Sequence, residues 1–263
     1  RLLTGAALFL QGCAGTPLAP WHTAELTEEY RAARADEVRT FEDYLRLEDR
    51  LFAQLEAKVY ARTELGPDTA LMRYSKGSAS DPQIREPNWN RSFELPAAAP
   101  VGGVLLLHGM SDSPYSLRAL GEELNRRNYW VVGLRLPGHG TAPSGLLNVR
   151  WEDMAAATQL AAEHLAQKVG KQSLHIVGYS TGAPLALDFT LNALDGRTGP
   201  VPASLAAAAD ALGVGGDGAR RLMRAQRAGG LAGTPDLAVA KLGQLLAQLL
   251  LVVWATGRRE HAS

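Results

Sequence analysis

The sequence has little cysteine and no excess of charge of either sign. One cysteine, Cys13, occurs among its 263 residues, so an internal disulfide is excluded. Lys and Arg together number 27, as do Asp and Glu, and the formal net charge is +0. This balance gives no electrostatic reason to expect nucleic acid as a partner, or anionic lipid bound through bulk charge. With 46% hydrophobic and 21% charged residues, the chain is predicted to be globular and long enough for one sizeable α/β domain.

The apolar run that opens the chain is too short to span a bilayer. It covers residues 2–10 and leads into Leu10-Gln11-Gly12-Cys13, which resembles a secretory signal that ends in a bacterial lipobox, with Gln11 as an atypical filler. The resemblance implies cleavage before Cys13 and lipid attachment to its thiol, which would anchor the protein to a membrane through acyl chains. By analogy with bacterial lipoproteins, Ala14 rather than Asp after the cysteine implies a lipoprotein of the cell envelope, at the outer membrane or facing the periplasm. The alternative is an ordinary buried cysteine near a helix start.

The chain divides into four predicted regions. They are a signal and lipobox-like segment (1–13), a helical and turn-rich N-terminal extension (14–95), an α/β core (96–200) and a tail (201–263). In the extension, apolar residues recur at helical spacing between residues 24 and 63, which predicts an amphipathic helix that packs on the main domain. Short strands are expected near "ALMRYS" and "NRSFEL".

The core alternates cleanly between two kinds of segment. "VGGVLLLHG", "YWVVGLRL" and "SLHIVGY" are predicted buried strands, and "PYSLRALGEELNRRN", "RWEDMAAATQLAAEHLAQKVG" and "GAPLALDFTLNAL" are predicted helices. Alternation at this spacing indicates βαβ units and a mostly parallel sheet with flanking helices.

The motif Gly-x-Ser-x-Gly lies between the last predicted strand and the last predicted helix. Its residues are Gly178, Ser180 and Gly182. A nucleophilic serine is mounted on such a sharp strand-to-helix turn, where both neighbouring positions must be small. The following helix also directs its N-terminal dipole toward the serine. Ser180 is therefore the candidate nucleophile.

A second element agrees with this interpretation. The first strong strand ends at His108-Gly109, and the loop after it can aim the backbone N–H of Met110 at a substrate carbonyl. Together with the N–H of Thr181 it would form an oxyanion hole. We expect His108, and likewise His139 in "LRLPGHGTAPSG", to fix their loops by hydrogen bonds rather than to transfer protons.

Three stretches in this order, "LLLHGMSDSPYSLRALGEEL", "LRLPGHG" and "HIVGYSTGAPLAL", resemble α/β-hydrolases of the esterase, monoacylglycerol lipase and lysophospholipase type. The resemblance covers about residues 90 to 195. It implies the α/β-hydrolase fold and an acyl-ester hydrolase with no metal and no organic cofactor, in which Ser180 is the nucleophile and Met110 and Thr181 donate to the oxyanion.

The chain has little that could activate Ser180. The family order is serine, then Asp or Glu, then His, each on a loop after a later strand. The one histidine after Ser180 is His261, in "GRREHAS", and the candidate acids are Asp210, Asp217, Asp236 and Glu260. None has the expected strand-and-loop setting, although His261 is retained as the candidate base.

The tail has an unusual composition. Ala, Gly, Leu and Arg make up 41 of the 63 residues from 201 to 263, and Phe, Tyr, Ile and Asn are absent there. A GC-rich gene read in a shifted frame yields this composition, and a genuine Ala/Leu-rich helical end or lid is the alternative. Its "LLLVVW" run sits inside a helical pattern. The C-terminal part of the fold is accordingly predicted to be incomplete.

The sequence therefore predicts a serine hydrolase that acts on small acyl esters through an acyl-enzyme. The alternative is a truncated or frameshifted, catalytically inactive hydrolase-like protein that at most binds acyl ligands. An interaction protein that uses its N-terminal helix is a third reading.

Overall fold

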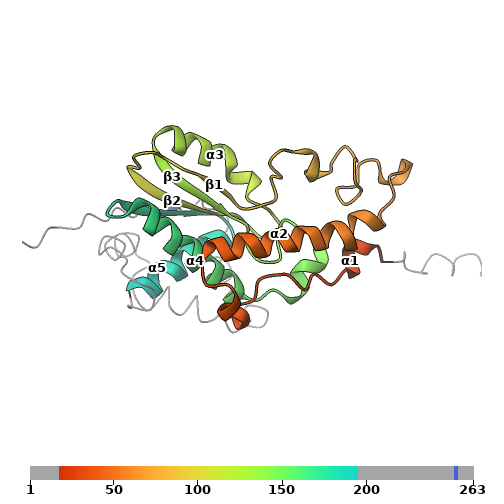
Figure 1. Cartoon of the computed structure of the whole chain (residues 1–263), viewed down its shortest axis with the longest axis horizontal. Helices are drawn as coiled ribbons and strands as arrows, with labels where there is room; N and C mark the ends of the chain where they lie inside the picture. Colours follow the sequence, from red (N-terminus) through yellow and green to blue (C-terminus); the bar gives the residue numbers. More distant parts are fainter. Residues whose placement is uncertain (1–17, 195–251, 254–263) are drawn as a thin grey trace, which may run out of the picture.

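The structure is a computed structural model, and it describes residues 18–194 and 252–253. Five strands form one sheet in the order β1-β3-β2-β4-β5. The central strands β2, β3 and β4 are parallel, whereas β1 and β5 join the two edges in the antiparallel direction. Helices cover both faces of this sheet (Figure 1).

The elements have the following bounds. The strands are β1 (Phe93–Leu95), β2 (Gly102–Leu107), β3 (Tyr129–Leu134), β4 (Ser173–Gly178) and β5 (Val252–Val253). The α-helices are α1 (Pro20–Thr23), α2 (Phe41–Lys58), α3 (Tyr115–Arg126), α4 (Trp151–Val169) and α5 (Gly182–Leu194). Short 3₁₀ helices are η2 (Ala32–Glu37), η3 (Tyr60–Arg62), η4 (Pro67–Thr69), η5 (Pro82–Ile84) and η6 (Pro143–Asn148).

The central strand β2 is buried at every position. A run of Gly, Val and Leu without alternation is typical of a parallel strand that is covered on both faces. Val104 and Leu106 pack with Leu117 of α3 on one face, while Leu105 and Leu107 face the opposite way, into the core shared with α4 and α5. The register places the last residue of β2, Leu107, opposite Gly178 of β4, so the loops that follow these two strands emerge side by side.

The N-terminal extension shares the main core. Phe41, Tyr44 and Leu47 of α2 belong to the same buried cluster as Leu105 and Leu134 of the sheet. Helix α2 packs along α4 on the face opposite α3, as Figure 1 shows. The extension therefore packs on the main domain and completes that face, as the amphipathic pattern predicts.

The single long helix expected between residues 24 and 63 is wrong in its extent. The α-helix begins only at Phe41, because the Thr40 side chain accepts a hydrogen bond from the Asp43 amide (3.1 Å) and Asp43 caps Thr40 in return. Upstream, residues 32–37 form a separate 3₁₀ helix. The apolar positions Tyr30 and Val38 are nevertheless buried in the same core, so the periodicity indicated the buried face correctly.

Two strand expectations have different outcomes. The strand near "NRSFEL" is present as β1 and pairs with β3. The strand near "ALMRYS" is absent, because residues 69–78 form consecutive turns. The amides of Met72, Ser75 and Ser78 each donate to the carbonyl three residues before them, over 2.9 to 3.1 Å. The backbone N–H groups are thus hydrogen-bonded within these turns, whereas in a strand they would pair with a neighbouring strand.

At the far edge, β5 differs from the helical pattern assigned to "LLLVVW". Its two valines pair antiparallel with Ile176 and Val177 of β4. Valine has two heavy atoms on Cβ and suits such a pleated edge better than a helix. The strand that leads to Ser180 therefore has a neighbour on each side, over two residues at β5.

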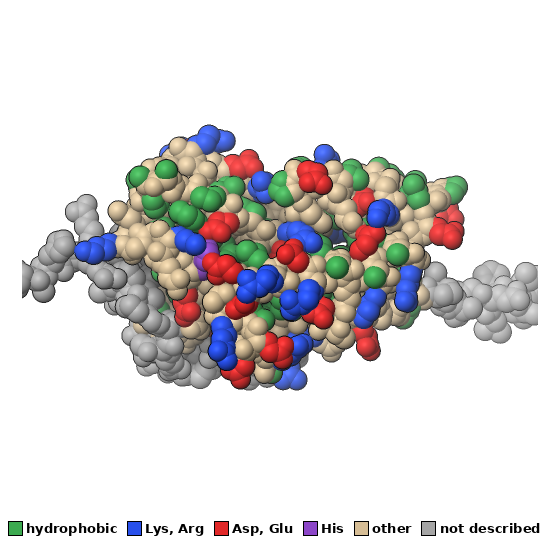
Figure 2. Space-filling view, viewed as in Figure 1, with side chains coloured by type: hydrophobic (Ala, Val, Ile, Leu, Met, Phe, Trp, Pro, Cys, Tyr) green, Lys and Arg blue, Asp and Glu red, His purple; other side chains and the backbone are tan. Residues whose placement is uncertain are grey.

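The exposed face of α2 carries charges of both signs. Figure 2 shows Lys and Arg interspersed with Asp and Glu over this helix. Arg46 pairs with Asp43, and Arg50 lies 3.0 Å from Glu28 of the preceding segment. Among the helices of the described residues, none combines the length and the apolar content that a membrane crossing needs.

Candidate active site

Ser180 occupies a strained turn between β4 and α5. Its φ angle of 50° lies in the left-handed region, which non-glycine residues rarely adopt. Such a conformation costs about 1 to 3 kcal/mol and persists only where the surrounding structure enforces it. Here the Tyr179 amide donates to the Leu107 carbonyl (3.3 Å), and the Gly182 amide donates to the Tyr179 carbonyl (2.9 Å).

The two glycines of the motif allow this turn by close backbone approach. A Cβ at Gly178 would overlap the carbonyl of Gly182. A Cβ at Gly182 would overlap the carbonyl of Leu107 at the end of β2. The turn is thus wedged between the neighbouring strand and the start of α5, and no larger residue fits at either position.

The loop after β2 lies directly against Ser180. A Cβ built on Gly109 would lie 3.1 Å from the Ser180 Cβ. Met110 follows, and this residue is 53% exposed. The turns that carry the amides of Met110 and Thr181 are therefore adjacent, as an oxyanion hole requires.

Two further contacts hold this loop to the elbow. The phenol of Tyr179 donates to an Asp112 carboxylate oxygen and lies 3.1 Å from the Ser116 hydroxyl. Asp112 also accepts from the Ser113 amide (2.7 Å). Tyr179 immediately precedes Ser180, so these bonds couple the loop of residues 108–116 to the turn. Neither Asp112 nor Tyr179 was predicted to have a role from the sequence.

His108 is fully buried and both of its ring nitrogens are engaged. Nε2 accepts a hydrogen bond from the Leu136 amide (3.1 Å), so Nδ1 carries the proton and donates to the Gly109 carbonyl (2.8 Å). Burial lowers the pKa of His108 to about 3, so the ring is neutral near pH 7. A ring with no free nitrogen holds its loop and cannot serve as a base.

Two other buried histidines have partners elsewhere in the core, although Nε2 of His139 has none among the described residues. His139 lies 2.9 Å from the Pro137 carbonyl through Nδ1, its ring packs edge-on against His108 at 5.1 Å, and burial lowers its pKa. His164 on α4 lies between Glu42 (3.1 Å) and Glu94 (2.8 Å). Within residues 18–194, no histidine hydrogen-bonds Ser180.

The remaining sequence-predicted residues lie outside the described part of the chain. These are Cys13, the candidate base His261, and the candidate acids Asp210, Asp217, Asp236 and Glu260. The described residues contain no group of three or more His, Cys, Asp or Glu that could hold a metal ion. The structure thus brings Ser180 together with the two predicted oxyanion turns, and the activating residues stay predictions.

Sequence reasoning missed Arg135, the first residue after β3. It is buried and ion-paired with Glu29 (2.9 Å) and Glu48 (3.0 Å) of the extension. A signal was present, because a charged residue stands directly after a buried strand and within "LRLPGHG". Its two partners, however, lie 87 and 106 residues earlier in the chain.

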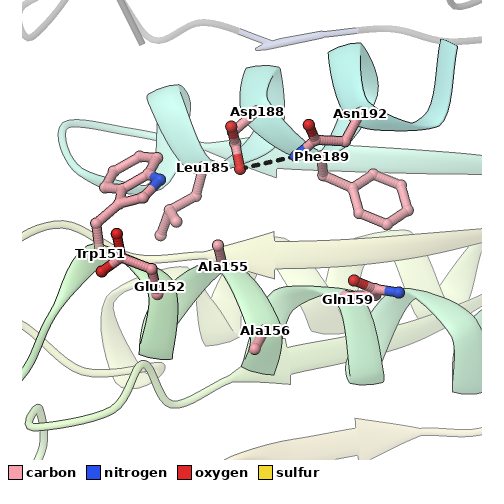
Figure 3. Close-up of a pocket in the computed structure, with 9 residues that line it drawn as sticks. All are labelled: Trp151, Glu152, Ala155, Ala156, Gln159, Leu185, Asp188, Phe189 and Asn192. Carbon is pink, nitrogen blue, oxygen red and sulfur yellow. Dashed lines mark hydrogen bonds between the residues drawn. The ribbon is translucent and has the colours of Figure 1, made fainter. Parts of the chain in front are cut away.

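A separate cavity of about 240 Å³ lies between α4 and α5 (Figure 3). Its lining is Trp151, Glu152, Ala155, Ala156, Gln159, Leu185, Asp188, Phe189 and Asn192. The Asn192 side chain donates to Asp188 across one side of it (3.1 Å). None of these residues belongs to the turn at Ser180 or to the loop at Met110, so the cavity is distinct from the elbow.

Comparison with known proteins gives consistent relatives. The chain is 32% identical over 122 residues to a thermostable monoacylglycerol lipase of Bacillus sp. (strain H-257), a match that covers 46% of this chain and 48% of that protein. It is 33% identical over 84 residues to a carboxylesterase of Bacillus subtilis (strain 168), covering 32% and 34%. A solved structure described with LipS and LipT, two metagenome-derived lipolytic enzymes, is 30% identical over 40% of each chain, with a TM-score of 0.36.

These matches span about half, or less, of the length of the curated relatives. The family assignment therefore rests on a broader match. The model of the alpha/beta hydrolase family matches residues 104–262, which is more than half of the 263 residues and includes both turns described above. The chain belongs to the alpha/beta hydrolase family.

Proposed function

We propose that this chain is a serine hydrolase of carboxylic esters, with Ser180 as its nucleophile. The observation that carries the proposal is the left-handed Ser180, at the end of a parallel strand and in contact with the loop of Gly109. The relatives named monoacylglycerol lipase and carboxylesterase favour an acyl ester as the substrate class.

The chemistry proceeds in two halves. The Ser180 oxygen attacks the acyl carbonyl carbon and gives its proton to a base, while the N–H groups of Met110 and Thr181 stabilise the developing oxyanion. The tetrahedral intermediate collapses, the alcohol leaves with that proton, and an acyl-enzyme remains. Water then attacks the acyl carbon, the acid is released and the Ser180 hydroxyl is restored. The N-terminus of α5, two residues after Ser180, favours negative charge at this place.

We infer that the base is a residue outside the described part of the chain, because no histidine within residues 18–194 hydrogen-bonds Ser180 and both ring nitrogens of His108 are engaged. His261 is the candidate. The same observation favours a second function: a hydrolase-like protein without turnover that at most binds acyl ligands beside the elbow. Loss of one triad member typically lowers the rate by several orders of magnitude.

A fluorophosphonate probe separates these two functions, because it labels an activated serine and leaves an inert one unmodified. The full chain is compared with Ser180→Ala, His261→Ala and the control Ser80→Ala, which changes an exposed serine in the extension. Labelling and p-nitrophenyl ester hydrolysis that are lost in Ser180→Ala alone support the esterase with another base. Loss in both Ser180→Ala and His261→Ala also assigns the base. If the probe does not label the unaltered chain, the esterase proposal is wrong and the inactive alternative remains.

We also propose that the protein is a lipoprotein of the bacterial cell envelope. The support is the Leu10-Gln11-Gly12-Cys13 segment after a short apolar run. The gene product should partition with membranes, and Cys13→Ser should release it or leave the signal uncleaved. Equal soluble fractions for both proteins would remove this proposal.

A further inference from the structure

The N-terminal extension reaches the active-site side of the sheet through one buried cluster. The Arg135 side chain is 1% exposed, and its guanidinium binds two carboxylates of the extension. Nε donates to Glu48 on α2 (3.0 Å), while Nη1 and Nη2 donate to the two oxygens of Glu29 (3.1 and 2.9 Å). Arg135 is the residue with which the chain leaves β3.

A buried cluster of this kind is costly. Removing each ion from water costs several kcal/mol, and packed apolar residues often replace such clusters with no loss of stability. Two carboxylates also face one guanidinium, and burial raises the pKa of Glu48. Stability alone therefore gives a weak reason for the cluster, and its geometry is more informative.

The guanidinium also holds the backbone that follows it. Nη1 donates to the carbonyls of Leu136 (3.3 Å) and His139 (3.0 Å). The Tyr44 hydroxyl of α2 donates to the Arg135 carbonyl (2.6 Å). An apolar residue in place of Arg135 would supply neither of the two Nη1 bonds, and the Tyr44 hydroxyl adds a third bond from the extension. The loop of residues 135–139 is therefore held by the guanidinium and by the extension that clamps it.

This loop in turn fixes the loop beside Ser180. The Leu136 amide donates to Nε2 of His108 (3.1 Å), which leaves Nδ1 to donate to the Gly109 carbonyl (2.8 Å). The Gly109 carbonyl and the Met110 N–H belong to one planar peptide group. A bond that holds the carbonyl therefore sets the direction of the N–H. The chain of contacts runs from Glu29 and Glu48 to the Met110 amide without a gap.

We propose that Arg135, clamped by Glu29 and Glu48, is a positioning residue for the oxyanion loop, and that the N-terminal extension is part of the catalytic apparatus. The inference rests on the proposed function, since the direction of the Met110 N–H matters for turnover only if an ester carbonyl binds at Ser180. A purely structural cluster would affect stability and leave the orientation of this amide unchanged.

The test uses the full chain with Glu48→Gln and Arg135→Lys, since lysine keeps the charge but lacks the fork of donors. The contacts that run from Glu29 and Glu48 through Arg135, Leu136 and His108 to the Met110 amide form a relay. Glu42→Gln is the matched control, because Glu42 is also on α2 and pairs with a core side chain, His164, but has no contact with the relay. The amide resonance of Met110 and the ring nitrogen resonances of His108 report the geometry directly by ¹⁵N NMR.

We expect both relay variants to shift these resonances and the control to leave them in place. Removal of an oxyanion donor lowers kcat about 10² to 10³-fold, so a misdirected donor should lower kcat about tenfold, with KM changed less than twofold. If a relay variant does not fold, Tyr44→Phe, which removes one hydroxyl, replaces it. Unchanged resonances in folded variants overturn the proposal, as does an unchanged kcat despite shifted resonances.

The two levels remain distinguishable. Loss of the proposed function would appear as unlabelled Ser180 in the unaltered chain, where the NMR comparison still decides whether the extension orients the Met110 amide. If Ser180 is labelled but the Met110 and His108 resonances do not change in the variants, the esterase proposal stands and the relay proposal is wrong.

Discussion

At the scale of single residues, the turn at Ser180 depends on close backbone contacts that only glycine allows. Gly182 faces the Leu107 carbonyl so closely that a Cβ would overlap it. Neither partner can move freely, because one is strand backbone and the other begins α5. We therefore expect Ser180 to keep its left-handed conformation only while this contact is intact.

Gly182→Ala should therefore destabilise the fold and disturb the elbow together. We expect a loss of about 3 kcal/mol in the free energy of unfolding, at the upper end for overpacking, and a loss of probe labelling at Ser180. Urea unfolding and labelling measure the two effects. Gly66→Ala is the control, since a Cβ there meets nothing closer than 4.0 Å. Equal stability of both variants would contradict the wedged turn.

His108 should also impose a pH dependence on stability. Its pKa falls from 6.5 to about 3 through burial, so the unfolded chain takes up a proton in this window and the folded chain does not. The stabilisation is thus present above pH 6.5 and is lost as the pH falls toward 3, by at most about 1.4 kcal/mol per pH unit.

Urea unfolding between pH 7 and pH 4 checks this expectation. His108→Gln keeps an acceptor near Nε2 but does not titrate, so its stability should fall less steeply with acid than that of the unaltered chain. Carboxylates elsewhere contribute equally to both proteins and cancel in the comparison. Identical slopes would show that His108 takes up its proton in the folded state as readily as in the unfolded one.

At the scale of elements, the boundary of α2 depends on one side chain. Thr40 caps the helix by accepting from the Asp43 amide. Thr40→Ala should lower the free energy of unfolding by about 1 kcal/mol, as loss of an N-cap typically does. Thr23→Ala offers a control, because its hydroxyl makes one long, exposed bond of 3.5 Å to the Ala19 carbonyl. A cap variant as stable as this control would mean that tertiary packing alone sets the start of α2.

The same elements indicate what the sequence could and could not predict. Strands β2 and β4 and helices α3 to α5 follow from local patterns, namely buried runs, helical periodicity and the glycines around Ser180. A signal for the start of α2 was also present in the sequence, since Thr40 and Asp43 lie three residues apart. The partners of Arg135 were not, because a bond between residues 106 positions apart leaves no mark in a local pattern. The oxyanion turns were thus predictable from motifs, and the contacts that hold them were not.

At the scale of the molecule, the extension and the sheet share one core. Tyr30, Phe41 and Tyr44 contribute to the main core, and Arg135 has its carboxylate partners only in the extension. A second tie joins the same parts, since His164 on α4 lies between Glu42 of α2 and Glu94 of β1. Removal of the extension would expose the apolar face of α4 and leave a buried guanidinium without partners.

A chain that begins at residue 64 should therefore fail to fold. An unpaired buried charge alone costs about 3 to 5 kcal/mol, comparable to the whole stability of many domains. We expect aggregation on expression, or a soluble product that binds a hydrophobic dye and unfolds without a cooperative transition. A chain that begins at Leu18 keeps every contact described above and should unfold cooperatively. Calorimetry of the two proteins tests this prediction. A cooperative transition in the shorter chain would mean that the α/β core folds without the extension.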